Sequence, residues 1–215
     1  MARRTQAERS DATTAGLITA AQELFGRDGY AATSIDAVAA AAGMTKGAAY
    51  HHFQSKAALL RAVFVRQQEE IAAELERVAA EEPDVRAALR RGVRTFLERC
   101  LDPAFRRIVL LDGPAVLGWD TVRAIEYDHV LRVLSAGIAA VAAQDAQDAE
   151  DTEGAGGAGG AGGGGGGGGA ARVRAQMLFG AVCEAGMLLA RSPAPRETFE
   201  TVLAEAERLL AAAMR

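Results

Sequence analysis

Residues 34–60 contain two short apolar segments that are separated by Gly43 and followed by a much longer third segment. Ser34 can cap the first segment as a helix, and the glycine can end it. A second short helix is expected at about residues 45–52, before a long helix that starts after Ser55. Two short helices joined by a tight turn are typical of a helix-turn-helix, which places its second helix in the major groove of DNA.

The composition of the whole chain favours an all-α fold. Half of the 215 residues are hydrophobic, and only 5% are aromatic. Alanine, the strongest helix former, is abundant, and no long stretch alternates apolar and polar residues as a half-buried strand would. We expect helices at about residues 9–26, 35–42, 45–52, 55–80, 84–101, 119–149, 172–191 and 196–214, with a further one that begins at Pro103.

One segment does not fit this helical pattern. Residues 150–171 begin with acidic side chains and become an almost pure Gly/Ala tract from Gly154. Glycine loses more conformational entropy on ordering than any other residue. The sequence therefore predicts a flexible Gly/Ala-rich linker over residues 150–171.

The net charge of −4 is unevenly distributed along the chain. Residues 1–60 contain six basic and five acidic side chains and carry +1, so the remainder carries −5. Because the local face that meets DNA matters more than the total charge, an acidic chain can still bind nucleic acid through its N-terminal part.

The sequence motifs of the helix-turn-helix segment are more specific than its pattern of helices. It reads Ala-Gly-x-x-Lys-Gly at residues 42–47, Tyr-x-His-Phe at 50–53, and Ser-Lys before the leucine pair at 59–60. These motifs resemble those of the N-terminal domain of the TetR family of bacterial transcriptional regulators. The resemblance implies an N-terminal three-helix helix-turn-helix DNA-binding domain in residues 1–54, and a helical effector-binding and dimerisation domain in residues 55–215.

The resemblance also implies which side chains meet DNA. Lys46 would bond the O6 and N7 acceptors of guanine, and Gly47 would let the backbone approach closely. Residues at the starts of helices would hold phosphates, because free N–H groups and the helix dipole favour anions there. Ala49 departs from the family pattern, which commonly has a larger aliphatic residue. The predicted DNA-binding residues are Thr33, Ser34, Thr45, Lys46, Gly47, Tyr50, His51 and Lys56.

The C-terminal part is less informative. Residues 112–119 resemble a stretch found in a subset of TetR-like C-terminal domains, but they identify no ligand. Apolar and aromatic side chains would line a cavity for a small apolar effector, with Arg123 as a polar partner. The predicted effector-binding residues are Phe96, Cys100, Phe105, Trp119, Arg123, Tyr127, Met177 and Phe179.

The family resemblance implies a homodimeric repressor that binds a palindromic operator in double-stranded DNA and is released by the effector. Two copies are expected because one short helix reads too few base pairs. No cofactor is implied, and the location is expected to be cytoplasmic. No apolar segment is expected to cross a membrane without a charge or glycine break.

Two alternatives stay open at this point. An architectural DNA-binding regulator would need no effector. A helical enzyme is disfavoured, since the chain has three histidines, no paired carboxylates in a recognisable spacing and no nucleophile motif. A metal site at His51 and His52 is not expected, because adjacent helical residues diverge by about 100°.

Overall fold

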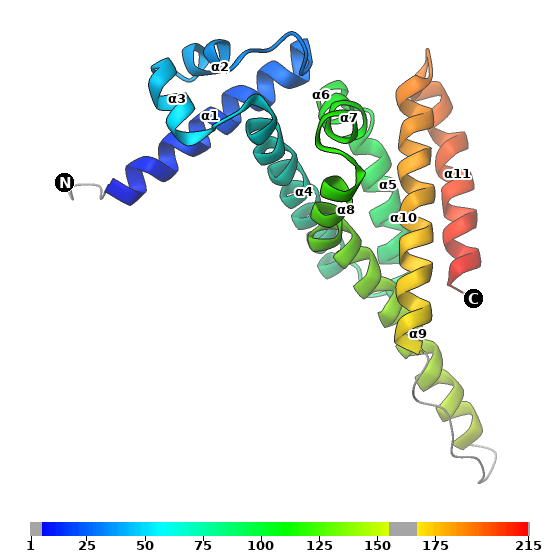
Figure 1. The fold of residues 1–215 in the computed structure, drawn as a ribbon. Coiled ribbons are helices and arrows are strands. Elements are labelled where there is room, and N and C mark those ends of the chain that lie inside the picture. The colour runs from blue at the N-terminus through cyan, green and yellow to red at the C-terminus, as the bar shows by residue number, and fades with distance from the viewer. Residues whose placement is uncertain (1–5, 155–166, 215) are drawn as a thin grey trace. The chain divides into compact units, whose positions relative to one another are not determined.

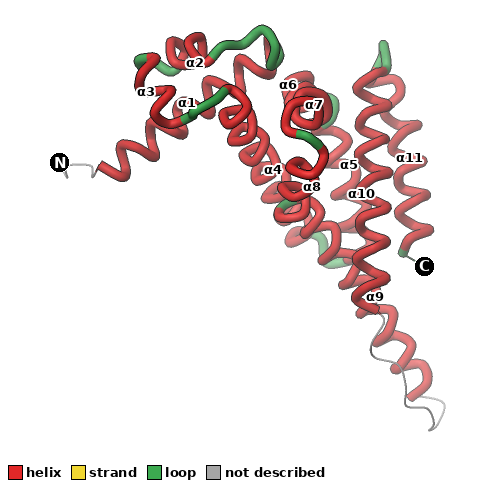
Figure 2. The backbone as a smooth tube through the Cα atoms, in the orientation of Figure 1, coloured by secondary structure: helices red, strands yellow, loops and turns green. Residues whose placement is uncertain are grey.

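The computed structural model describes residues 6–154 and 167–214, and within these ranges the chain is helical with no strand (Figure 2). The expected all-α fold is therefore confirmed. The chain divides into two compact units, each built from two stretches of sequence. The first unit comprises Met1–Gln68 and Asp102–Ile125, and the second comprises Glu69–Leu101 and Glu126–Arg215.

The first unit holds the helix-turn-helix. Its elements are α1 (Gln6–Asp28), α2 (Ile35–Ala41), α3 (Lys46–His52), the first half of α4 (Lys56–Glu81), α6 (Pro103–Phe105), the π-helical turn η1 (Arg106–Asp112), α7 (Gly113–Leu117) and most of α8 (Trp119–Asp128). Helix α1 packs against α2 and α6, and α2 packs against α3 (Figure 1).

The predicted Ser34 cap and Gly43 turn shape the helix-turn-helix, and Thr45 adds a cap that the sequence analysis did not expect. The Ser34 hydroxyl accepts from the Ala37 N–H at 3.1 Å, and the Thr45 hydroxyl accepts from the Ala48 N–H at 3.2 Å. Such caps satisfy N–H groups that have no partner within the helix. Gly43 adopts φ 68°, a left-handed conformation that residues with a side chain rarely take.

Helix α1 is longer than the sequence indicated. It was expected to end at Gly26, but it continues to Asp28, and Gly29 with φ 87° follows it. Gly26 instead lies buried inside the helix, where an added Cβ would lie 2.6 Å from the Ala104 Cβ. The absence of a side chain at Gly26 therefore lets α6 pack closely on α1.

The second unit is a bundle of longer helices. It contains the second half of α4, α5 (Val85–Arg99), α9 (Val130–Gly154), α10 (Gly167–Arg191) and α11 (Pro195–Ala213). Helix α10 packs along both α9 and α11, and α5 contacts all three of these helices (Figure 1). The largest fully buried side chains of this unit are Ile71, Leu97, Leu131, Ile138 and Leu189.

Two expectations for the C-terminal half need correction. The single helix expected at 119–149 is interrupted at His129, which separates α8 from α9. The predicted linker 150–171 is helical at both ends, because α9 runs to Gly154 and α10 starts at Gly167. The middle of the predicted linker, residues 155–166, lies outside the described residues.

One described helix approaches a membrane span in length and composition, although Arg174, Gly180, Glu184 and Gly186 interrupt it, as the sequence analysis expected. Among the described residues, one stretch, Arg172–Arg191 of α10, is long and apolar enough to cross a membrane by length and composition. Its mean hydropathy is 1.3. Since α10 packs on α5, α9 and α11, a core helix of a bundle explains this composition as well.

We expect Gly26→Ala to lower the free energy of unfolding by about 1–3 kcal/mol, because the new methyl group overpacks the contact with Ala104. The helix propensity of alanine offsets only part of this cost. Gly47→Ala is the matched control, since an added Cβ there meets nothing within 4 Å. Urea denaturation of both variants measures the difference, and equal stabilities would contradict close packing at Gly26.

Candidate nucleic-acid interface and apolar cavity

Helix α3 has one buried side and one side that faces solvent. Ala49 is only 1% exposed, and Phe53, directly after the helix, is buried as well. On the other side, Lys46, Gly47 and His51 are exposed, and Tyr50 is 44% exposed. The polar residues predicted for α3 therefore lie together on the accessible surface, next to a glycine that leaves the backbone uncovered.

Lys46 is held in a defined position on this surface. Its Nζ lies 2.7 Å from the Asp36 Oδ2 on α2, and 5.6 Å from the centre of the Tyr50 ring. The hydrogen bond and the negative charge of Asp36 raise the pKa of Lys46 above its usual value. Because both side chains are exposed, this ion pair is open to exchange with another anion.

Helix α3 is anchored to α1 by contacts that the sequence analysis did not find. The His52 Nδ1 and the Thr14 Oγ1 form a hydrogen bond of 3.0 Å across 38 residues of sequence. In the turn just before α3, the Met44 side chain lies close to α1, since an added Cβ at Gly16 would be 3.1 Å from the Met44 Cε. Neither contact has a signal in the sequence, because both depend on how the helices cross.

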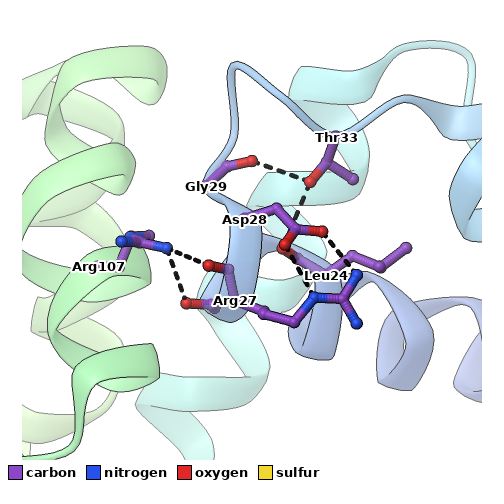
Figure 3. A network of polar contacts seen from close by, with 7 residues as sticks. Leu24, Arg27, Asp28, Gly29, Thr33 and Arg107 are labelled. Carbon is purple, nitrogen blue, oxygen red and sulfur yellow. Dashed lines mark hydrogen bonds and ion pairs between the residues drawn. The ribbon is translucent and has the colours of Figure 1, made fainter.

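Three of the predicted DNA-binding hydroxyls serve the fold. Ser34 and Thr45 cap α2 and α3, as described above. Thr33 is buried, and its hydroxyl donates to the Gly29 carbonyl at 2.9 Å, with the Leu24 carbonyl at 3.4 Å (Figure 3). Thr33 thus holds the end of α1 to the loop before α2, while Ser34 and Thr45 remain exposed.

Lys56 also has partners within the protein. Its Nζ donates to the Tyr30 carbonyl at 2.8 Å, to the Thr33 carbonyl at 3.0 Å and to the Ala31 carbonyl at 3.4 Å. It also lies 4.2 Å from the centre of the Tyr30 ring. These contacts tie the start of α4 to the loop between α1 and α2, so any phosphate would have to share an ammonium that already has three acceptors.

Residues of η1 also hold this loop and the end of α1. The Arg107 Nη1 donates to the carbonyls of Gly26 and Arg27, the former at 3.2 Å, at the C-terminal end of α1 (Figure 3). The Tyr30 N–H donates to the Asp112 Oδ2 at 2.8 Å. A cation at the carbonyl end of a helix stabilises it. Sequence reasoning missed this pair because Arg107 and Asp112 lie about 80 residues beyond their partners.

The second unit contains an apolar cavity of about 430 Å³ that is partly open to solvent. It lies between the end of α4, α5, α9 and α10, and its walls include Leu75, Leu89, Val93, Phe96, Val133 and Phe179. Three charged side chains reach its lining: Glu76, Glu82 and Arg132. Its size and apolar lining are those of a small-molecule site.

The predicted effector residues do not gather in one place. Phe96 and Phe179 line the cavity and meet edge to face, with ring centres 6.4 Å apart. Cys100 and Phe105 are fully buried and do not line it. The other four, which also lie outside the lining, are Trp119 (66% exposed), Met177 (72% exposed), Arg123 and Tyr127. The small and branched residues that form most of the walls carried no signal in the sequence.

Metal binding has no candidate in the described part of the chain. No group of three or more His, Cys, Asp or Glu side chains is placed there to hold an ion. The ring centres of His51 and His52 lie 5.6 Å apart with an interplanar angle of 81°, and His52 is hydrogen-bonded to Thr14.

Two family profiles match the chain. Residues 17–63 match the profile described as bacterial regulatory proteins, tetR family. Residues 86–155 match the profile described as tetracyclin repressor-like, C-terminal domain. Together the two matches span more than half of the 215 residues.

Individual proteins show the same similarity. The chain is 29% identical over 131 residues to the transposon Tn10 TetC protein of Escherichia coli, and 34% identical over 128 residues to the HTH-type transcriptional regulator CymR of Pseudomonas putida. These alignments cover 61% and 58% of the chain, and span 66% and 63% of those relatives. A crystal structure of a TetR-family transcriptional regulator from Pectobacterium atrosepticum superposes with a TM-score of 0.71 at 29% identity, covering 97% of each chain.

We expect Lys56→Met to lower the free energy of unfolding by about 1–3 kcal/mol, because carbonyls bonded to a charged group lose their partner. Methionine keeps an apolar stem of similar length. Lys46→Met is the control, since its ammonium is exposed and should leave the unfolding midpoint nearly unchanged. Chemical denaturation compares the two, and a neutral Lys56→Met would show that the loop does not depend on this ammonium.

Proposed function

The chain belongs to the TetR family of bacterial regulatory proteins, and from this premise we propose that it is a sequence-specific DNA-binding transcriptional regulator, most simply a repressor. The observation that carries the proposal is the accessible side of α3, where Lys46, Gly47, Tyr50 and His51 are exposed while Ala49 is buried. A helix-turn-helix binds the major groove with this side of its second helix.

The proposed contacts fall into two groups. Lys46 exchanges Asp36 for the acceptors on a guanine edge, and Gly47 allows the backbone of α3 to come close to the bases. Tyr50 and His51 meet the sugar-phosphate backbone, and the exposed caps Ser34 and Thr45 lie at helix starts where phosphates are favoured. Phosphate contacts position the protein on the duplex, while base contacts select the sequence. Thr33 and Lys56 stabilise the loop before α2 through their hydrogen bonds to backbone carbonyls.

We further propose that the protein acts as a homodimer on a palindromic operator. Helix α10 exposes Val173, Met177 and Leu188, and the neighbouring α11 exposes Leu209. Exposed apolar side chains in a row on one helix favour association with another copy. The high exposure of Met177 fits this role better than contact with an effector.

The cavity supports a regulator that responds to a small apolar effector in the cytoplasm. In this proposal residues 1–54 bind DNA, residues 55–215 bind the effector and dimerise, and the effector releases the operator. Release requires that the effector bind the DNA-incompetent state more tightly, since equal affinity for both states shifts nothing. Nothing in the exposed surface of α3 or in the cavity suggests catalysis.

The test of DNA binding is a selection from random duplexes followed by gel shifts with the selected site. We expect Lys46→Ala and Tyr50→Ala each to weaken specific binding by about tenfold or more, because a dimer loses each contact twice. Both variants should keep the wild-type melting temperature and dimeric mass, since the two side chains are exposed. Wild-type affinity of both variants would contradict the assignment of α3 as the recognition helix.

Substitution of Asp36 tests the same surface through an expected gain of DNA affinity. We expect Asp36→Asn to strengthen binding to any duplex and to steepen the salt dependence of log K by about 0.9 per protomer, because it removes a negative charge from the DNA-facing surface and frees the Lys46 ammonium from its ion pair. Asp120→Asn on α8 is the control, as it changes the total charge equally at another exposed carboxylate. Fluorescence anisotropy over a salt series measures both variants. Unchanged or weaker binding by Asp36→Asn would show that Asp36 does not restrain Lys46.

A further inference from the structure

We propose that the cavity of the second unit accepts a hydrophobic ligand with one positive charge, an alkylammonium-type cation, whose charged end lies at Glu82. This inference rests on the proposed function, in which the cavity holds the effector, and it names the chemical class of that effector. It depends on the balance of charges around an otherwise apolar space.

The cavity is suited to the apolar part of such a ligand. Its walls are built from aliphatic and aromatic side chains of four helix segments, among them Leu89 and Val93 of α5, Val133 of α9 and Phe179 of α10. A volume of about 430 Å³ holds a small molecule without opening the bundle. An alkyl chain placed there leaves water and contacts carbon on several sides, which is favourable in proportion to the area buried.

The charged residues of the lining are not balanced. Arg132 is already engaged, since its Nη2 lies 2.6 Å from the Glu76 Oε1 and its Nε donates to the Asp128 carbonyl at 3.3 Å. Glu82 stands directly after the last residue of α4 and is half-buried. Within the described residues it has no ion pair and no hydrogen bond to another side chain or to the backbone. The lining therefore has one carboxylate in excess.

This excess selects among ligands of the same shape. An anionic ligand would place a second negative charge beside Glu82, and to bind Arg132 it would have to displace the Glu76 carboxylate, which would leave a second carboxylate of the lining without its cation. A neutral ligand would cover a half-buried carboxylate without compensating it. A cation compensates that carboxylate, and because Glu82 keeps contact with water the gain is moderate.

Three probes with one chain and different head groups test the proposal: n-octylamine, 1-octanol and octanoate, each titrated into the full-length protein by calorimetry at pH 7. An amine of this kind is fully protonated at that pH, as lysine is. We expect octylamine to bind about three- to tenfold more tightly than octanol, which follows from the strength of partly exposed ion pairs, and octanoate to bind least. These titrations need no DNA, so they can fail or succeed independently of operator binding.

Two variants separate the charge from the cavity. Glu82→Gln should remove the advantage of octylamine and leave octanol binding unchanged. Glu81→Gln is its matched control, because Glu81 is the preceding carboxylate, does not line the cavity and is paired with Arg77 and Arg91. Val133→Trp should fill the space and weaken all three probes.

The result that supports the proposal is a preference for octylamine that disappears in Glu82→Gln and persists in Glu81→Gln. Equal affinities for the three probes, no binding of any of them, or the same loss in both glutamate variants would each overturn it. Failure of Val133→Trp to weaken binding would overturn the location, since the probes would then bind elsewhere.

Discussion

The helix-turn-helix depends on how the loop between α1 and α2 is held. Lys56 donates to the carbonyls of Tyr30 and Thr33 from the start of α4, while Asp112 accepts from the Tyr30 N–H on the side of η1. Arg107 reaches the last carbonyls of α1 from the same turn. These hydrogen bonds restrain the loop, and the loop sets the direction in which α2 begins. The position of α3 follows, because α3 packs on α2.

The two lysines of the chain illustrate why residue type alone does not assign a role. Both match the family motifs, and both were predicted to contact DNA. The Lys56 ammonium donates hydrogen bonds to backbone carbonyls of the protein, whereas Lys46 has one exposed carboxylate as its partner. The backbone carbonyls around Lys56 are fixed by the fold, but the exposed Asp36 partner of Lys46 exchanges readily with another anion. Lys46 is therefore the lysine that is available to a ligand.

Much of the architecture could be predicted from periodicity and caps. The apolar face of α2, the Ser34 cap and the Gly43 turn are local features, so a short window of sequence contains all the information they need. Close approaches between distant segments could not be predicted in this way. Gly26 has the sequence signal of a helix end, but it lies inside α1, where the lack of a side chain leaves room for Ala104.

The cavity shows a second limit of sequence reasoning. Aromatic side chains stand out in a chain with few of them, so they were chosen as lining, but a cavity forms where small and branched side chains leave space. Phe96 and Phe179 do line it. Trp119 follows Gly118, which has φ 79°, and it is largely exposed at the start of α8. Its aromatic character alone could not show that it lies outside the cavity.

Helix α10 gives the proposed effector a short path to the proposed dimer contact. Phe179 and Val182 of this helix line the cavity, while Met177 and Leu188 are exposed elsewhere along it. A helix is stiff over this length, so a ligand that displaces Phe179 also displaces the exposed residues nearby. A partner that packs on Met177 then meets a shifted surface. A ligand in the cavity and a second copy of the chain would thus act on opposite sides of one helix, and the free energy that links them is reciprocal.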